Sequence, residues 1–446
     1  MPSPHLATLL RLLQPLRFAV GYRRSFATML VLVAGWVLTQ APMHCVTEAL
    51  VVTDVARRRH WQAFHRFFSR GTWAPDALGL VVLRLVRRLG AAGPVRLVLD
   101  DTLCAKKGPA VFGLGSHLDA VRSTKKRKVF AFGHSWVVLA VVVTPPFSAR
   151  PWALPVLFRL YRTKATCAPE AFRKRTELAR AMLDRLLAAL PDGPLEVSAD
   201  EAYCNGTVVG GLSARVTWVG AMRPDAALTA PLGARAATGR PRKRGAPLPK
   251  PKELAADAHA RWQRLRTALY GRARTVQYKT MTGVWWRVCG ASPVRVVVVK
   301  TEGGAVPLRV FFCTDVARSV ESILVGYSCR WSIEVLFREL KQLFGFADSP
   351  ARSEQAVRRT APFVGLVYSA LVVWFAEGVA TSSLGTPPVR PWYPHKKGLC
   401  FADVLRAAQR ALRDVDVLEL PALLERLEKA AEVKKTPANY PLDRAA

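Results

Sequence analysis

Three acidic positions in this chain could hold divalent metal ions. Either Asp100 or Asp101 at the end of one short β-rich run is the first, Asp200 at the end of another run is the second, and Glu334, in a segment without glycine or proline, is the third. Carboxylates brought together at strand ends repel one another unless a cation lies between them. Their oxygens select Mg²⁺ or Mn²⁺, and two such ions about 3.5 to 4 Å apart can activate a water or a 3′-hydroxyl at a phosphodiester. The acids therefore indicate two-metal phosphodiester chemistry, unless each one only caps a strand or pairs with a nearby arginine.

The segment 327–344 is predicted to form one helix, because the next residue is a glycine and no earlier residue in it interrupts a helix. At about 100° per residue, Tyr327, Arg330, Glu334 and Lys341 share an arc of roughly 60°. Beside this arc lies an apolar stripe of Ile333, Leu336, Phe337, Leu340 and Phe344. The alignment of a tyrosine, two cations and a carboxylate favours a functional face over a merely solvated one.

The charge of the chain predicts a polyanionic partner. The 446 residues include 66 Lys and Arg against 32 Asp and Glu, a formal net charge of +34. Half of the residues are apolar. This excludes a wholly disordered basic tail, because such tails lack the apolar surface that offsets the entropy of ordering.

Two segments concentrate basic residues. The loop 234–252 is rich in proline and glycine and could place an extended basic strip in a narrow minor groove, or be only a flexible basic loop. The segment 56–68 interleaves basic and aromatic residues, which suits phosphate contact with base or sugar packing, but also an arginine face over an aromatic core. The basic residues singled out in the loop are Arg240, Arg242, Lys243 and Arg244.

The order of elements predicts four regions and an α/β fold class. Residues 1–90 are expected to be helical, and residues 91–206 to begin a mixed sheet with flanking helices. A mostly antiparallel β insertion is predicted for 207–320, and 321–446 would complete the core and add a helical C-terminal region. The expected strands are 95–99, 129–132, 136–144, 195–200, 275–278, 284–288, 294–300 and 308–313, with a helix at 169–190 and turns at 282–283 and 303–304.

Cysteine usage and hydropathy bear on the compartment. The eight cysteines contain no C-x-x-C pair, which argues against a zinc ribbon or a disulfide framework and favours a reducing cytosol. We expect no signal peptide. Three apolar segments, 26–41, 129–147 and 361–376, are each interrupted or shorter than the roughly 20 apolar residues of a membrane span, so we expect buried core rather than membrane helices.

The spacing Tyr-x2-Arg-x3-Glu-x6-Lys, matched by Tyr327, Arg330, Glu334 and Lys341, resembles the signature of bacterial insertion-sequence transposases of the DDE class. The runs Asp-Asp-Thr at 100–102 and Ala-Asp-Glu-Ala-Tyr at 199–203 resemble the two aspartate motifs of that family. The resemblance, known by its Tyr-Arg-Glu-Lys (YREK) letters, implies an RNase H-like catalytic core over about residues 95–350.

The resemblance also implies metal ligands. Asp100, Asp200 and Glu334 would bind two Mg²⁺ or Mn²⁺ ions. Asp101 directly precedes Thr102 and could replace Asp100, and the alternation of side chains along a strand means that only one of the two faces the metals.

Further roles follow from the same resemblance. Tyr327, Arg330 and Lys341 would contact DNA phosphates near the cut, the arginine through its planar fork and the lysine as a point charge. Trp285 or Trp286 would stack on a flipped base, or simply pack within the insertion.

The function expected from these observations is cut-and-paste DNA transposition. The protein would bind terminal inverted repeats, hydrolyse phosphodiester bonds at the element ends and join the 3′-hydroxyl to target DNA. It would act in the cytoplasm at the nucleoid, as a homodimer on double-stranded DNA and without a membrane. The alternatives are a DNA-binding repressor without catalysis, a two-metal nuclease without strand transfer, and a membrane-associated protein.

Overall fold

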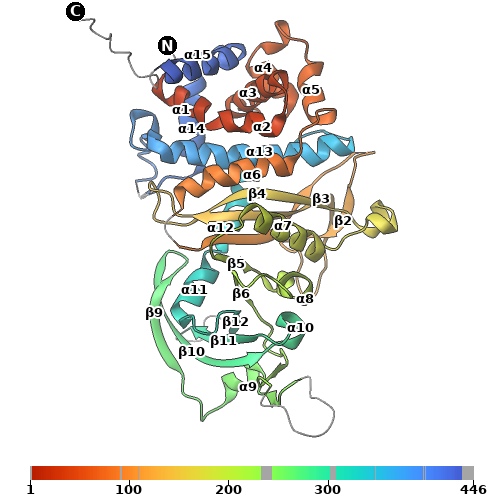
Figure 1. Ribbon diagram of the computed structural model, residues 1–446, viewed down its shortest axis with the longest axis vertical. Coiled ribbons are helices and arrows are strands. Elements are labelled where there is room, and N and C mark those ends of the chain that lie inside the picture. Colours follow the sequence, from red (N-terminus) through yellow and green to blue (C-terminus); the bar gives the residue numbers. More distant parts are fainter. Residues whose placement is uncertain are drawn as a thin grey trace, which may run out of the picture. The chain divides into compact units, whose positions relative to one another are not determined.

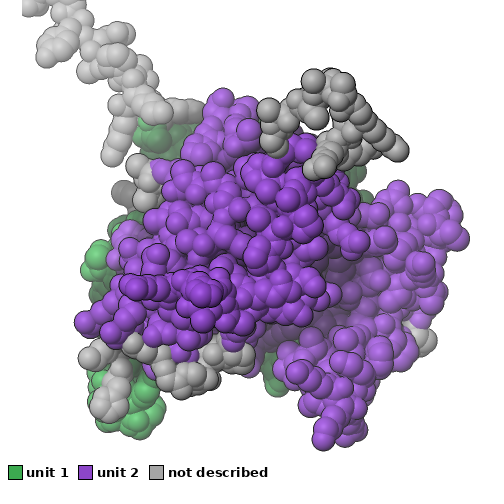
Figure 2. All heavy atoms as spheres, turned by 90° about the horizontal axis from the view of Figure 1, so that it is seen from below, with its two compact units in different colours: residues 1–85, 344–446 green, residues 86–343 purple. Residues whose placement is uncertain are grey.

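The computed structural model of the chain describes residues 3–90, 93–108, 110–232, 244–301, 308–346, 348–394, 396 and 398–433 (Figure 1). Its contacts divide the chain into two compact units, which Figure 2 colours separately. Unit 1 comprises Met1–Leu85 and Phe344–Ala446, and unit 2 comprises Val86–Leu343. Unit 1 therefore combines the two ends of the chain. The division into four regions stays a prediction from the sequence.

Unit 1 is helical, in agreement with the helical content expected for residues 1–90. Its central helix is α13, against which α1, α5 and α14 pack. The residues of α13 from Thr360 to Trp374 are all buried, which explains why this helix is apolar around its whole circumference. The helices of unit 1 are α1 (Pro4–Leu13), α2 (Arg17–Val20), α3 (Arg23–Leu38), α4 (Val46–Val52), α5 (Gln62–Ser69), α6 (Pro75–Val86), α13 (Glu354–Trp374), α14 (Phe401–Leu412) and α15 (Leu420–Val433).

The three apolar segments of the sequence lie mainly in α3, in the strand β3 (Phe130–Val143) and in α13, whose residues are largely buried. Among the described residues, one helix, Glu354–Val379, is long and apolar enough to cross a membrane by length and composition, and 83% of its most apolar window is buried inside the protein. A buried core helix meets the same two criteria.

Unit 2 is built on a twelve-stranded mixed sheet with flanking helices (Figure 1). The strand order is β2-β3-β1-β5-β6-β12-β11-β10-β7-β8, with β4 paired to β3 and β9 paired to β10. Besides β3, the strands are β1 (Val95–Ala105), β2 (Gly115–Leu118), β4 (Trp152–Tyr161), β5 (Leu195–Ala199), β6 (Val216–Ala221), β7 (Leu228–Thr229), β8 (Pro247–Leu248), β9 (Gln263–Leu269), β10 (Arg272–Val284), β11 (Pro293–Thr301) and β12 (Arg309–Cys313).

The first half of this sheet combines two pairing directions. The strands β1, β5 and β6 run parallel to one another, whereas β3 pairs antiparallel with both β1 and β4. Because parallel strands end at the same edge of a sheet, Asp100 in the second half of β1 and Asp200 after β5 lie toward one edge. The helices of unit 2 are α7 (Arg175–Ala189), α8 (Gly206–Val209), α9 (Pro251–Ala256), α10 (Trp286–Cys289), α11 (Val320–Ser328) and α12 (Trp331–Leu343).

The insertion is mostly antiparallel as predicted, apart from β6, which runs parallel to β5, but its strands do not form a sheet of their own. The strand β12 pairs with β6, so β10, β11 and β12 continue the first half of the sheet. The strand β9 joins β10 through a two-residue turn at Tyr270 and Gly271, which both have positive φ, as hairpin turns of this length require.

Two predictions within the insertion are wrong. The expected strand 284–288 is instead the end of β10 followed by the helical turn α10, and β10 runs through the expected turn at 282–283. The ring of Trp285 packs edge-on against Phe312 at 5.0 Å between centroids, so a tertiary contact overrides the β propensity of this aromatic and β-branched run. The expected turn at 303–304 lies outside the described residues.

The strand β4 has no counterpart among the predicted strands. It contains Pro155, which the sheet accommodates because β4 pairs only with β3 and because the register shifts between Leu139 and Ala140, opposite this proline. An edge strand with a bulge can hold a proline that would break the hydrogen bonds of a central strand.

Candidate active site

The two adjacent aspartates of β1 point to different partners. One Oδ of Asp100 lies 3.1 Å from a guanidinium nitrogen of Arg330, at the junction of α11 and α12. Asp101 instead accepts a hydrogen bond of 2.7 Å from the hydroxyl of Tyr203 and lies 3.3 Å from the guanidinium of Arg175 in α7. Successive side chains of a strand point to opposite faces, so Asp100 alone shares a partner with the helix that carries Glu334.

Arg330 joins Asp100 to Glu334. Its Nη1 lies 3.1 Å from Asp100, and its Nη2 donates to Oε1 of Glu334 at 2.7 Å. The Arg330 and Asp100 side chains are 15% and 16% exposed, so this pairing is shielded from solvent. A carboxylate of β1 and a carboxylate of α12 are therefore held at one guanidinium group.

The predicted single helix over 327–344 is wrong in one respect. The helix α11 ends at Ser328 and α12 begins at Trp331, with a tight turn at Cys329 and Arg330. The amides of Ser332 and Ile333 bond carbonyls three residues back rather than four, which tightens the chain at this point. The turn directs Arg330 toward Asp100, and α12 ends at Leu343, before Gly345 with its positive φ, as expected.

Tyr327 therefore lies on a different helix from Glu334. Its ring packs against Phe311 at 4.5 Å between centroids, and the guanidinium of Arg330 lies 5.7 Å from the ring centroid. Burial raises the pKa of Tyr327 to about 12, despite the positive charge of Arg330. In this arrangement its side chain is partly buried beside the hydrophobic core of unit 2.

Asp200 lies at the N-terminus of a short 3₁₀ turn, Glu201–Tyr203, where its Oδ1 accepts the amide of Ala202 at 3.0 Å. Burial and then the negative charge of Asp200 raise the pKa of Asp100 to about 7, more than Arg330 lowers it. Burial also raises the pKa of Asp200. The sheet therefore brings together two carboxyl groups whose ionisation is costly without an added positive charge.

Lys341, the last residue of the resemblance, donates a hydrogen bond of 2.6 Å to the carbonyl of Leu103 in β1. This bond joins the second half of α12 to the strand that carries Asp100. Of the four residues that carry the resemblance, Arg330 contacts Asp100, Glu334 bonds Arg330 and Lys341 bonds β1, whereas Tyr327 packs against β12.

The donor set suits a hard divalent cation in its chemistry, because Asp100, Asp200 and Glu334 all offer carboxylate oxygens. Within the described ranges, however, no three Asp, Glu, His or Cys side chains are grouped closely enough to hold a metal ion. Arg330 lies between two of the three acids, and its buried Nε has no hydrogen-bond partner. A metal ion bound by Asp100 and Glu334 would compete with this guanidinium for the same oxygens.

Sequence reasoning missed the residues around Asp101. Arg175 lies 4.1 Å over the ring of Tyr161, and its Nε donates to the hydroxyl of Ser135 at 3.1 Å. Tyr203 stood inside the quoted motif three residues after Asp200, which was the available signal for its role. Nothing in the sequence around Arg175 distinguishes it from the other surface arginines.

Comparison with known proteins identifies the family of the chain. Residues 18–284, more than half of the chain, match the family described as "DDE superfamily endonuclease". The chain is a DDE superfamily endonuclease. Residues 289–384 also match the family described as "Archaeal putative transposase ISC1217". The search of curated proteins found no match.

A solved structure entitled "Cryo-EM structure of piggyBac transposase synaptic complex with hairpin DNA" is similar to this DDE endonuclease, with a TM-score of 0.45 and 10% sequence identity. The similarity covers 94% of this chain and 77% of that chain. Because the protein belongs to the DDE family of transposases and endonucleases, it is a nuclease. Members of this family generally use divalent metal ions.

The basic and aromatic residues predicted to contact DNA are only partly described in this DDE endonuclease. Arg240, Arg242 and Lys243 lie outside the described residues. Arg244 lies 5.5 Å over the ring of Trp286, which it covers. Since Trp285 packs on Phe312, both tryptophans have partners within the insertion, and their stacking on DNA stays a prediction.

In the segment 56–68, Phe64, Phe67 and Phe68 are buried, as expected for an aromatic core under an arginine face. Arg59 lies 5.0 Å over the ring of Phe64 and donates to Thr28 at 2.7 Å. Arg59 therefore has a structural role within unit 1.

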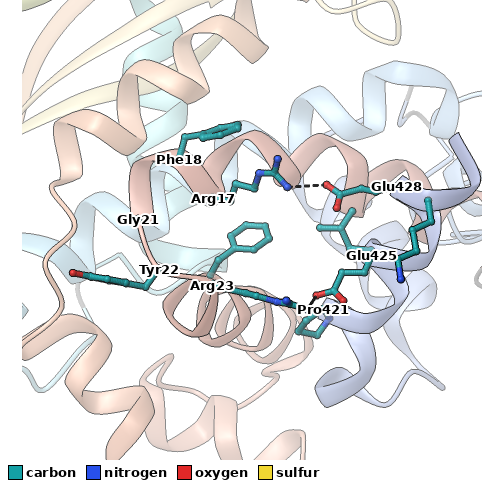
Figure 3. A pocket seen from close by; sticks show the side chains of 11 residues that line it. Arg17, Phe18, Gly21, Tyr22, Arg23, Pro421, Glu425 and Glu428 are labelled. Carbon is teal, nitrogen blue, oxygen red and sulfur yellow. Dashed lines mark hydrogen bonds and ion pairs between the residues drawn. The ribbon is translucent and has the colours of Figure 1, made fainter. Parts of the chain in front are cut away.

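Two cavities differ in charge. One of about 660 Å³ lies in unit 2 beside Tyr327 and Arg330 and is also lined by the exposed cations Arg274 and Arg309. The other, of about 690 Å³, lies in unit 1 between α2, α3 and α15 (Figure 3). There Glu428 pairs with Arg17 at 3.2 Å and Glu425 pairs with Arg23, so of the cations that line this second cavity only Lys429 is not balanced by a lining acid. The cavity beside Arg330 is the better candidate for an anionic ligand.

Proposed function

We propose that this DDE endonuclease is a cut-and-paste DNA transposase with an RNase H-like catalytic core. It binds the terminal inverted repeats of a mobile element, hydrolyses phosphodiester bonds at the ends and joins the freed 3′-hydroxyl to target DNA. The antiparallel β3 beside the parallel β1, β5 and β6 is the strand arrangement that supports the RNase H-like core.

One observation carries this proposal. Arg330 bonds both Asp100 and Glu334, while the charge of Asp200 raises the pKa of Asp100. Asp100 and Glu334, which lie far apart in the chain, share one guanidinium group, and Asp200 is near enough to Asp100 to raise its pKa. These relationships support the three acids as the metal ligands that the YREK resemblance implies. A purely structural role for each acid gives no reason for this convergence.

Asp100, Asp200 and Glu334 are the residues that would hold two Mg²⁺ or Mn²⁺ ions. Bound there, the ions would activate the attacking hydroxyl and stabilise the leaving oxygen of the phosphodiester. Asp101, although adjacent in sequence, is engaged by Tyr203 and Arg175 and would not be a ligand.

Arg330 would contact the DNA phosphate at the cut, because its planar fork suits phosphate oxygens as well as carboxylates. Metal ions on Asp100 and Glu334 would take over the carboxylates that now hold this guanidinium, leaving it for the phosphate. Lys341 and Tyr327 would support the same phosphate, the former as a point charge.

The partner is double-stranded DNA, at the element ends and at the target. The net charge of +34 supports it, because cations that neutralise phosphates release counterions and so drive binding. Two ends must be held together for transposition, so we propose a homodimer in the DNA-bound complex, acting at the nucleoid in the cytoplasm.

The experiment is an assay of cleavage and strand transfer on labelled DNA that carries the element ends, with Mg²⁺. Joined products from the native chain support transposition. Cleavage without joining would instead indicate a two-metal nuclease, and binding without cleavage under any divalent metal would indicate a repressor.

A further inference from the structure

A basic hairpin projects from the sheet of unit 2. We use this name for residues 115–133, which comprise β2, the connecting loop 119–129 and the start of β3. The two strands pair antiparallel, with Leu118 opposite Phe130 and Ser116 opposite Phe132. The strand β2 is the first strand of the sheet order and lies at its edge.

The loop of the basic hairpin gathers positive charge. Five of its residues are cationic, and all five are exposed. Among the described residues, the structure records no ion pair or side-chain hydrogen bond for any of them. The only acid in the loop, Asp119, uses Oδ1 to accept the amides of Val121 and Arg122, both at 3.1 Å. The cations are Arg122, Lys125, Lys126, Arg127 and Lys128.

The loop is nevertheless held in one shape. The hydroxyl of Ser123 accepts the amide of Val129 at 2.9 Å, and the hydroxyl of Thr124 accepts the amide of Arg127 at 3.0 Å. These side-chain bonds close the turn from inside and direct the charged side chains outward. The cations are therefore presented on a preformed turn, which lowers the entropy lost on binding.

Apolar side chains lie next to this charge. Phe130 and Phe132 are 64% and 63% exposed and lie on the same face of β3, because residues two apart share a face. Leu118, opposite Phe130, is 46% exposed. Two neighbouring exposed phenylalanines on a strand are costly in water, and they indicate a surface that a partner covers.

The basic hairpin extends past the catalytic edge of the sheet. Gly133 pairs with Ala105 at the C-terminal end of β1, and Val138 pairs with Asp100. Phe130 therefore lies roughly 27 Å along β3 from the position of Asp100, at about 3.4 Å per residue. This is less than one turn of duplex DNA, about 34 Å, so one duplex could contact both.

We propose that the basic hairpin binds double-stranded DNA within one helical turn of the cleaved bond. The five cations would contact phosphates on both sides of a groove, and Phe130 and Phe132 would pack against sugars and base edges inside it. A two-stranded ribbon fits the major groove, and apolar side chains are common contacts in the minor groove. The inference rests on the proposed function, because it places the hairpin on the DNA that the acids cut.

A second copy of this chain is a less suitable partner for the basic hairpin than DNA. It carries the same net charge of +34, so two loops of this kind would repel each other. Three exposed apolar side chains also cover far less than the ~800 Å² per partner that a stable protein interface buries.

The test compares the salt dependence of DNA binding. A hairpin variant carries Lys125→Ala, Lys126→Ala, Arg127→Ala and Lys128→Ala, and a control variant carries Arg11→Ala, Arg413→Ala, Arg426→Ala and Lys429→Ala. Both lose the same charge from exposed positions.

Binding of the full chain to a fluorescent duplex of random sequence is measured over a series of salt concentrations. We expect the hairpin variant to reduce the slope of log K against log salt by about 2 to 4, and to weaken binding at least about tenfold, whereas the control changes far less. Equal losses in the two variants would overturn the proposal.

A second variant tests the phenylalanines. Phe130→Ser with Phe132→Ser should weaken binding about tenfold while the salt slope stays that of the native chain, because the lost contacts are uncharged. The mass of the native chain in sedimentation without DNA should equal that of this variant. A mass that falls on substitution would make the surface a contact between copies and overturn the proposal.

The native chain offers a check that needs no substitution. Trypsin cleaves after Lys and Arg, so duplex DNA should protect the tip of the basic hairpin from cleavage, and a loop cut equally fast with and without DNA contradicts the proposal. Failure of the proposed function looks different. A chain that never cuts DNA, yet shows the hairpin-dependent salt slope, would refute transposition and leave the hairpin as a DNA-binding element.

Discussion

The hydroxyl of Tyr203 donates a hydrogen bond of 2.7 Å to Oδ1 of Asp101. Asp101 follows Asp100 in β1, and Tyr203 comes three residues after Asp200. One hydrogen bond therefore joins the backbone segments that carry two of the three proposed metal ligands, and Arg175 adds a connection from α7. We interpret Asp101 as a residue that positions the site rather than one that binds metal.

Removing this bond should cost stability. Tyr203→Phe keeps the buried ring but removes the hydroxyl that donates to the partly buried carboxylate of Asp101, which keeps Arg175, so we expect a loss of about 1 to 2 kcal/mol in the free energy of unfolding. The measurement is chemical denaturation. The control is Tyr161→Phe, which keeps the ring contact with Arg175 and should change the stability by no more than about 0.5 kcal/mol. Equal effects of the two substitutions would remove the special role of the Tyr203 hydroxyl.

The two adjacent aspartates should separate in function. Asp100→Asn should abolish DNA cleavage, because it removes a proposed metal ligand. Asp101→Asn should leave measurable cleavage while lowering the free energy of unfolding, because its carboxylate serves Tyr203 and Arg175. The rate of cleavage and the unfolding curve are measured for both variants. An inactive Asp101→Asn beside an active Asp100→Asn would reverse the assignment.

A buried ion pair of unit 2 should be important for stability. Glu196 in β5 is 3% exposed, and its Oε2 accepts from Arg318 at 2.6 Å. Arg318→Met leaves this carboxylate buried without its closest cation, which should cost about 3 to 5 kcal/mol in the free energy of unfolding. Arg358→Met breaks an exposed pair with Glu354 and should cost less than about 1 kcal/mol. Similar costs for both would show that burial of Glu196 is not the deciding factor.

The carboxyl group of Asp403 in unit 1 should make the folded protein less stable in acid. Burial raises the pKa of this carboxyl, but hydrogen bonds from Lys396, the amide of Cys400 and Arg390 outweigh it and lower the pKa to about 2. A carboxyl with a lowered folded pKa stabilises the protein above its unfolded pKa, near 3.8, and this contribution disappears as the pH falls through the folded pKa.

The free energy of unfolding should therefore fall by on the order of 2 kcal/mol between about pH 4 and pH 2 through this group alone. Unfolding of native protein and Asp403→Asn is compared across this range. The variant should be less stable at neutral pH, and its free energy of unfolding should fall less steeply than that of the native protein as the pH drops from about 4 to 2. An equally steep fall for the two proteins would contradict the role of Asp403 in acid unfolding.

Local patterns in the sequence predicted six of the twelve strands and the helical character of unit 1. The run at 95–99, the apolar run at 136–144 and the helix stop at Gly345 all appear in the structure. What local patterns could not show was pairing. Nothing in the sequence of β12 indicates that it joins β6, and Pro155 concealed β4 because its accommodation depends on a bulge in β4 itself, where Val156 has no partner in β3.

The candidate site was predicted only in part for the same reason. The spacing of Arg330 and Glu334 indicated a shared face, and their contact is in the structure. The choice between Asp100 and Asp101 depended on which face of β1 meets α12, which is a tertiary property. The helix break at Cys329 was hidden, because no proline or glycine marks a turn that tertiary contacts impose.

The most direct test of the central claim is DNA cleavage and strand transfer with Mg²⁺ by the native chain and by Glu334→Gln. The account predicts joined products from the native chain, none from the variant, and the same affinity of both for DNA that carries the element ends. Cleavage retained by Glu334→Gln would contradict the claim that Asp100, Asp200 and Glu334 together form the catalytic site.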